Sequence, residues 1–71
     1  MDSYEVMVEA SAENCCEVYY RELFDDEDEA RKDFHRIAKE VRDGLWGEHR
    51  TAWLNIIRDG EYFASEYVVE G

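Results

Sequence analysis

The sequence predicts one two-layer α+β domain in which a single amphipathic helix covers one face of a mostly antiparallel sheet, in the order ββαββ. Three observations support this fold class. Residues 4–10 alternate apolar and polar side chains, residues 27–43 carry one apolar stripe at helical spacing, and two β-rich runs flank an Asp-Gly pair. The chain has 71 residues and no proline. Residues 1–71 are therefore expected to form a single small acidic domain.

The first two predicted strands form a hairpin. Alternation over residues 4–10 is typical of a half-buried strand, residues 11–14 predict a reversal, and residues 16–21 alternate again. A second strand pairing back on the first is the favoured interpretation, because the Cys-Glu-Val-Tyr-Tyr run is rich in β-formers. A short helix within residues 12–24 is the alternative, with Ser11 as its N-cap.

The clearest element is a helix over residues 27–43. Asp26 is the predicted N-cap, with Glu29 imitating a capping box, and Gly44 is expected to take the left-handed conformation at the far end. The apolar stripe comprises Ala30, Phe34, Ile37, Ala38, Val41 and Leu45. Intrahelical ion pairs are expected for Glu27 with Arg31, and for Asp28 and Glu29 with Lys32.

The last two strands, residues 51–58 and 61–69, are joined by Asp59 and Gly60, a strong signal for a two-residue hairpin turn. A regular register then pairs Ile56 with Phe63. On that register the helix-facing set is Ala52, Leu54, Ile56, Phe63, Tyr67 and Val69. The uncovered face receives Trp53, Ile57, Tyr62, Ala64 and Val68, with Met7 and Tyr19 added by the first hairpin.

Charge and size exclude several classes of function. The chain carries 19 Asp and Glu against 8 Lys and Arg, a net charge of -11. An anionic field of this strength argues against direct binding to nucleic acid or to an anionic membrane, and favours a basic partner. A chain this short has no room for a deep catalytic pocket. No nucleophile–base pair or phosphate loop is visible, so we expect no enzyme and no cofactor.

Metal, redox and targeting signals are also weak. An EF-hand counted from Asp25 fails, because its sixth and twelfth positions hold Ala30 and Arg36, and no metal site is expected. Cys15 and Cys16 are adjacent, which strains a disulfide between them, so no disulfide framework is predicted. No basic leader or long apolar run is present, which predicts a cytoplasmic protein.

Two groups of residues are candidates for partner binding. The acidic group, centred on five consecutive carboxylates, comprises Asp25, Asp26, Glu27, Asp28, Glu29 and Asp33. The apolar group on the uncovered sheet face comprises Trp53, Ile57 and Tyr62, and it could contact a partner or a second copy in a homodimer. The acidic group supplies charge for steering, whereas aromatic anchors usually carry more of the binding energy.

These features predict a small interaction protein that inhibits a nucleic-acid-binding protein or ribonucleoprotein complex, by nucleic-acid mimicry or by steric blockade. In size, charge and predicted rigidity the chain resembles, in type, the phage-encoded inhibitors of CRISPR and restriction systems. That resemblance implies action in the cytoplasm of a host cell. The alternative is a halophile-adapted homodimeric structural or adaptor protein, whose acidity maintains solubility in salt and whose role is not inhibitory.

Overall fold

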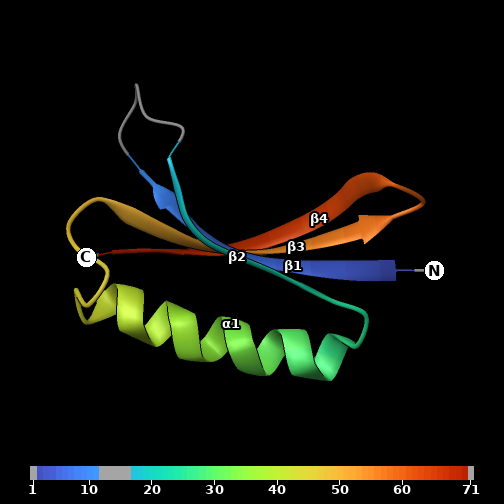
Figure 1. Ribbon diagram of the computed structural model, residues 1–71, viewed down its shortest axis with the longest axis horizontal. Helices are drawn as coiled ribbons and strands as arrows, with labels where there is room; N and C mark the ends of the chain where they lie inside the picture. Colours follow the sequence, from blue (N-terminus) through green and yellow to red (C-terminus); the bar gives the residue numbers. More distant parts are fainter. Residues whose placement is uncertain (1, 12–16, 71) are drawn as a thin grey trace.

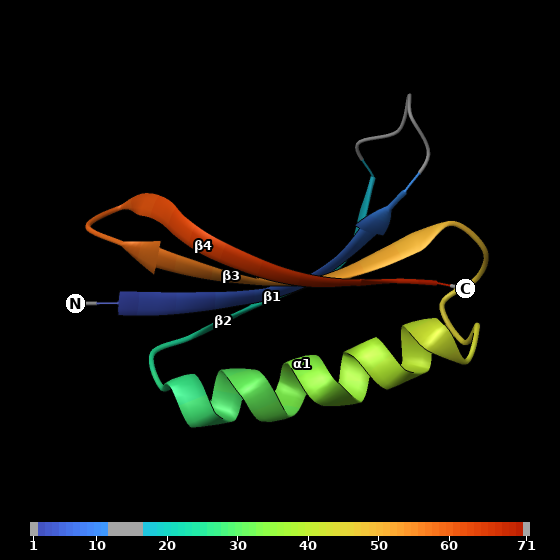
Figure 2. The ribbon, with the colours of Figure 1, turned by 180° about the vertical axis from the view of Figure 1, so that it is seen from behind.

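One helix lies along one face of a four-stranded antiparallel sheet, which confirms the predicted two-layer α+β architecture (Figure 1). The structure is a computed structural model and describes residues 2–11 and 17–70. The elements are β1 (Asp2–Ala10), β2 (Val18–Phe24), α1 (Glu27–Arg42), β3 (Arg50–Arg58) and β4 (Glu61–Val69). The strand order is β2-β1-β3-β4, so β2 and β4 are the two edges of the sheet. In both views, the last residues of β1 and the first residues of β2 rise away from α1 at one end of the sheet, and the β3-β4 hairpin rises away from it at the other, so the uncovered face is concave (Figure 2).

The hydrophobic core lies between α1 and the two central strands. Every second residue of β1 points to the helix, as the alternating pattern predicts, and Val6 and Val8 are completely buried there. The core residues are Tyr4, Val6, Val8, Ala30, Phe34, Ile37, Ala38, Val41, Ala52 and Leu54. Tyr20, Phe24, Trp46, Ile56 and Val68 pack around this cluster, so all five elements contribute to one core.

The second segment is a strand over its described part. β2 pairs antiparallel with β1, and Tyr4 lies opposite Phe24. The helical alternative is therefore wrong for residues 18–24, while residues 12–16, including Cys15 and Cys16, lie outside the described residues. The register shifts from Val8 opposite Tyr20 to Glu9 opposite Val18. Tyr19, expected on the uncovered face, lies at this shift with its ring 4.1 Å from the Arg50 guanidinium carbon.

The N-cap and the C-terminal glycine of α1 follow the prediction, but within the described residues the Glu29 carboxylate makes no hydrogen bond to the Asp26 amide, so the predicted capping box is not formed. At the start, Asp26 accepts a hydrogen bond from the Asp28 amide at 3.1 Å. At the end, Asp43 is the C-cap and Gly44 has a φ of 78°, with its amide bonded to the Val41 carbonyl. The Leu45 amide donates a hydrogen bond to the Glu40 carbonyl at 3.0 Å, which completes a Schellman motif.

One member of the predicted helix stripe does not reach the core. Leu45 is 73% exposed because the Schellman turn carries it off the helix face, and Trp46 packs against the core in its place. The indole of Trp46 donates to Glu40 Oε1 at 3.0 Å and meets the Tyr20 ring edge-on at 5.7 Å. The prediction that Leu45 is a core residue is therefore wrong.

The last hairpin has the predicted turn but not the predicted register. Asp59 and Gly60 have φ values of 53° and 81°, as a two-residue turn with left-handed central residues requires. Ile57 pairs with Tyr62, but Ile56 pairs with Ala64, so Phe63 is an extra residue in a β-bulge. From Ala64 onward, the bulge therefore places each residue of β4 on the face opposite to the one predicted.

The prediction for the faces of β4 is corrected accordingly. Ala52, Leu54 and Ile56 face the helix as expected, but on β4 the residue that packs on the core is Val68, not Val69. Phe63, Tyr67 and Val69 are exposed. The Tyr67 ring lies 5.1 Å from that of Trp53, on the uncovered face. Among the described residues, no helix has both the length and the apolar content needed to cross a membrane.

Candidate partner-binding surfaces

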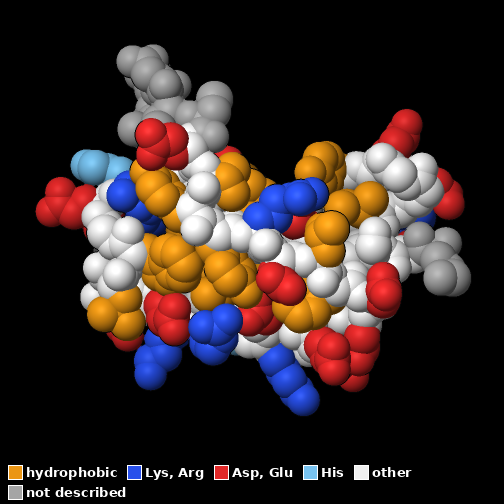
Figure 3. Space-filling model, viewed as in Figure 1, with side chains coloured by type: hydrophobic (Ala, Val, Ile, Leu, Met, Phe, Trp, Pro, Cys, Tyr) orange, Lys and Arg blue, Asp and Glu red, His pale blue; other side chains and the backbone are white. Residues whose placement is uncertain are grey.

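The acidic run occupies the loop after β2 and the first turn of α1. Asp25, Asp26, Glu27, Asp28 and Glu29 are all exposed. Side chains of Asp and Glu gather at this end of the helix on the molecular surface (Figure 3). The cap formed by Asp26 fixes the start of the helix, so these carboxylates project from ordered backbone.

Few cations compensate this run. Glu27 pairs with Arg31 at 2.9 Å, as predicted, and Arg31 also reaches Glu66 on β4 at 2.8 Å. Within residues 2–11 and 17–70, no ion pair engages Asp25, Asp28 or Glu29, so the pairs expected with Lys32 are not formed. The run therefore presents a net negative surface to solvent.

Asp33 has a different role from the rest of the acidic group. It accepts a hydrogen bond from the Tyr20 hydroxyl at 2.5 Å and one from Arg36 at 2.6 Å. Only 14% of its side chain is exposed. Burial, together with the hydrogen bond to Asp33, raises the pKa of Tyr20 to about 12. Asp33 thus ties α1 to the edge strand β2, and its charge is already compensated by Arg36.

The structure separates the acidic group from the apolar group. The acidic run belongs to the helix layer, whereas Trp53, Ile57 and Tyr62 lie on the side of the sheet that the helix leaves uncovered. Tyr62 is 68% exposed, and Trp53 and Ile57 are half-buried. One flat partner surface cannot contact both groups at once. They are therefore two distinct candidate surfaces.

At the centre of the uncovered face lies a polar network that the sequence patterns did not predict. Glu5 on β1 is only 1% exposed. One of its carboxylate oxygens accepts from Asn55 Nδ2 at 2.9 Å and from the Tyr62 hydroxyl at 3.2 Å, and the other accepts from Arg21 Nε. Ser65 Oγ in turn lies 2.7 Å from Asn55 Oδ1. The network links all four strands.

The balance of burial and hydrogen bonding keeps Glu5 ionised. Burial alone would raise the pKa of the Glu5 carboxyl, but the hydrogen bonds from Asn55, Arg21 and Tyr62 hold that pKa below its usual value. The neighbouring Glu5 charge raises the pKa of Tyr62, which further favours the neutral phenol that donates to Glu5. A buried carboxylate with this many donors is a fixed structural element of the uncovered face.

One signal in the sequence could have revealed the network. Asn is depleted in strands, and Asn55 interrupts the apolar run of β3 directly opposite Glu5. Predicting the contact requires the order β2-β1-β3-β4, which brings residues from four separate strands together.

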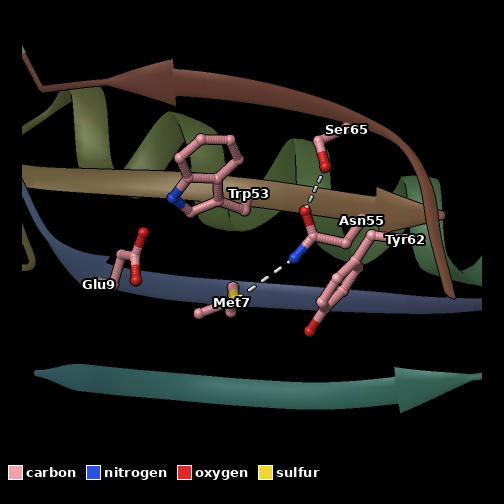
Figure 4. Close-up of a pocket in the computed structure, with 6 residues that line it drawn as sticks. All are labelled: Met7, Glu9, Trp53, Asn55, Tyr62 and Ser65. Carbon is pink, nitrogen blue, oxygen red and sulfur yellow. Dashed lines mark hydrogen bonds between the residues drawn. The ribbon is translucent and has the colours of Figure 1, made fainter. Parts of the chain in front are cut away.

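An open hollow of about 390 Å³ lies beside the network (Figure 4). Its lining comes from β1, β3 and β4 and comprises Met7, Glu9, Trp53, Asn55, Tyr62 and Ser65. The indole Nε1 of Trp53 is buried and, in the described part of the chain, has no acceptor. In the same part, no three His, Cys, Asp or Glu side chains converge as a metal site would require.

Comparisons with protein-family models, with curated proteins and with solved structures give no match to this chain.

Proposed function

We propose that this chain is a small, non-enzymatic acidic protein that binds a basic nucleic-acid-binding protein or ribonucleoprotein complex and blocks its nucleic-acid site. The observation that carries the proposal is the exposed acidic run on an ordered helix start, in which Asp25, Asp28 and Glu29 have no cationic partner among the described residues. Inhibition of CRISPR or restriction systems in the cytoplasm of a phage-infected host is the biological setting that we propose.

Charge density supports mimicry. An α-helix rises ~1.5 Å per residue, so Asp28 and Glu29, neither of which has a cationic partner within the described residues, are spaced along its axis much as the charges of duplex DNA are, at one per ~1.7 Å. A protein groove that attracts phosphates would therefore also attract this helix end. The mimic needs no pocket of its own, because the receptor supplies the groove.

The test is competition for a nucleic-acid site. A labelled DNA duplex is bound to a CRISPR effector complex or a restriction enzyme, and displacement by the protein is followed by fluorescence anisotropy across a salt series. The triple variant Asp25→Asn/Asp28→Asn/Glu29→Gln should displace DNA at least about tenfold less well at low salt, because steering and pairing with basic side chains are lost. Asp26 is left intact to preserve the cap.

The matched control removes three exposed carboxylates elsewhere: Glu48→Gln/Asp59→Asn/Glu61→Gln. It changes net charge equally but leaves the acidic run unaltered, so displacement should stay close to that of the wild type. If both variants displace DNA equally poorly, the effect depends on total charge and not on the acidic run. Equal displacement by the wild type and the acidic-run variant would contradict mimicry.

A homodimeric adaptor is the second candidate, and the uncovered face favours it. Tyr62 and Tyr67 are 68% and 61% exposed there, beside Trp53. Exposed aromatic groups of this kind often mark an interface. Sedimentation velocity at rising concentration tests it: a dimer that Trp53→Ala dissociates supports this candidate, whereas a monomer at all concentrations excludes it.

A further inference from the structure

The hollow on the uncovered face contains one carboxylate, that of Glu9, which forms no hydrogen bond or ion pair within the described residues. Its walls include the Trp53 ring on β3 and the Tyr62 ring on β4, and Glu9 on β1 points toward the indole (Figure 4). Met7 and Asn55 lie between them on the floor. At about 390 Å³, the hollow is near the lower limit for ligand sites, which suits one side chain of a partner.

Most polar groups of the hollow are already committed to one another. Asn55 donates to Glu5 and lies 3.4 Å from the sulfur of Met7, while Ser65 Oγ and Asn55 Oδ1 share a hydrogen bond. The Tyr62 hydroxyl donates to Glu5, whose charge is compensated by Arg21. These groups shape the hollow and hold its walls in place.

Glu9 differs from these groups. Its side chain is half-buried at the edge of the hollow, and within residues 2–11 and 17–70 no hydrogen bond or ion pair engages its carboxylate. The sequence of residues 12–16 contains no Lys, Arg or His that could serve as a partner. The hollow therefore combines an uncompensated carboxylate with two aromatic rings, which is the complement of an organic cation.

The chain itself shows which cation suits such rings. The Arg58 guanidinium carbon lies 3.9 Å from the centre of the Phe63 ring, and that of Arg50 lies 4.1 Å from the centre of the Tyr19 ring. A planar guanidinium can stack on an indole and donate two parallel hydrogen bonds to a carboxylate, whereas an ammonium group cannot do both. Trp presents the strongest aromatic face for such contact.

We infer that the hollow between Trp53 and Tyr62 binds an arginine side chain of a basic partner protein, with the guanidinium on the Trp53 ring and its N–H groups donating to Glu9. The net charge of -11 favours a basic segment over any other occupant. The inference shares with the proposed function only the assumption that the partner is basic. It concerns the sheet face, not the acidic run, so each can fail without the other.

The test uses a capped peptide, acetyl-Gly-Ser-Arg-Gly-Ser-amide, with matched peptides that carry lysine or citrulline in place of arginine. Binding is followed by amide and indole NMR shifts. The arginine peptide should bind weakly but saturably and should shift the Trp53 indole proton and the Glu9 amide. The citrulline peptide, which is nearly isosteric but uncharged, should not bind, and the lysine peptide should bind several-fold more weakly.

Two variants with the same change of charge decide the location of the site. Glu9→Gln should weaken binding of the arginine peptide about fivefold, because the carboxylate acceptor is lost. Glu48→Gln, at an exposed carboxylate outside both candidate surfaces, should leave binding within a factor of two of the wild type. Equal affinity for the arginine and citrulline peptides, or equal weakening by both variants, would overturn the inference. Neither result depends on inhibition of any nucleic-acid-binding protein.

Discussion

The Tyr20 hydroxyl donates a 2.5 Å hydrogen bond to Asp33, which joins the edge strand β2 to the middle of α1. Asp33 shares the helix with the acidic run, and its residue type alone cannot distinguish it from Asp28. Its position distinguishes it, because the Asp33 carboxylate turns toward the sheet. It accepts hydrogen bonds from Tyr20 on β2 and from Arg36 on the next turn of α1. We therefore assign Asp33 to the stability of the fold, so the proposed partner binding depends on the exposed run without it.

This contact predicts a loss of stability in alkali. The pKa of Tyr20 is about 12 in the folded protein, against 10.0 for the ordinary phenol, so the fold favours the neutral form. The stabilisation is complete below pH 10 and is lost as the pH rises toward 12, because the unfolded chain releases its proton first. The Tyr20→Phe protein lacks this pH-dependent stabilisation. At neutral pH its free energy of unfolding should be lower than that of the wild type by about 1 kcal/mol.

Urea unfolding of both proteins between neutral pH and pH 11 measures the effect. Other tyrosines titrate in both proteins, so the difference in unfolding free energy isolates Tyr20. That difference should shrink as the pH rises. A difference that stays constant would show that the Tyr20 hydroxyl is not held neutral by the fold.

The Glu5 network predicts an opposite dependence in acid. The pKa of Glu5 is lowered by its donors, so the stabilisation is present above the ordinary carboxyl pKa and is lost as the pH falls through the folded value. Glu5→Gln should lose about 1–3 kcal/mol at pH 7, because Arg21 loses its partner and a neutral amide replaces the carboxylate acceptor. Arg21 is half exposed, which limits the cost.

Glu9→Gln is the matched control, on the same strand and the same face. It should change the unfolding free energy by less than about 0.5 kcal/mol, because its carboxylate has no partner within the described chain. Thermal unfolding of the three proteins at pH 7 and pH 3 provides the comparison. If Glu5→Gln is as stable as Glu9→Gln at pH 7, the network contributes nothing to folding.

The Asp59-Gly60 turn predicts a local backbone effect without any clash against the rest of the fold. Gly60 has a φ of 81°, and a Cβ added there would meet nothing within 4 Å. Gly60→Ala should therefore cost about 1–2 kcal/mol from left-handed backbone strain alone. Gly60→Asn should cost less, because Asn tolerates this conformation. Denaturation midpoints of the two variants test the order, and equal midpoints would contradict it.

The apolar stripe of α1 provides a matched pair for the core. Ile37 is completely buried whereas Leu45 is 73% exposed, although one periodic pattern contains both. Ile37→Ala should cost about 2–5 kcal/mol, and Leu45→Ala less than about 0.5 kcal/mol. Loss of cooperative unfolding in Ile37→Ala would be consistent with this cost in a domain so small. A comparable loss in Leu45→Ala would contradict the exposed position.

Local patterns predicted most of the fold, and one non-local event limited the rest. The alternation in β1, the stripe and caps of α1, and the Asp59-Gly60 turn each depend on near neighbours in the sequence, and each is present. The bulge at Phe63 depends on how β4 meets the curved sheet, and one extra residue was enough to move Tyr67 and Val68 to opposite faces from those predicted.

The candidate surfaces follow the same division: the acidic run could be predicted from local sequence, whereas the uncovered sheet face could not. Consecutive carboxylates from Asp25 to Glu29 at a capped helix start must be exposed, because no core can hold them. The concave face could not be inferred, since Glu5, Arg21, Asn55 and Tyr62 come from four strands whose order emerges only from the complete sheet.

In the part of the chain that the structure describes, both edges of the sheet are unpaired, and β4 presents nine residues that include neither proline nor lysine. At neutral pH, repulsion between molecules of like charge holds such edges apart. Near the isoelectric point of about 4.4 that barrier vanishes, and strand-by-strand stacking of one copy on the next becomes favourable. The acidity that would attract a partner should therefore also oppose edge-to-edge association of this protein, and purification near pH 4.4 should produce aggregates that dissolve again when the pH is raised.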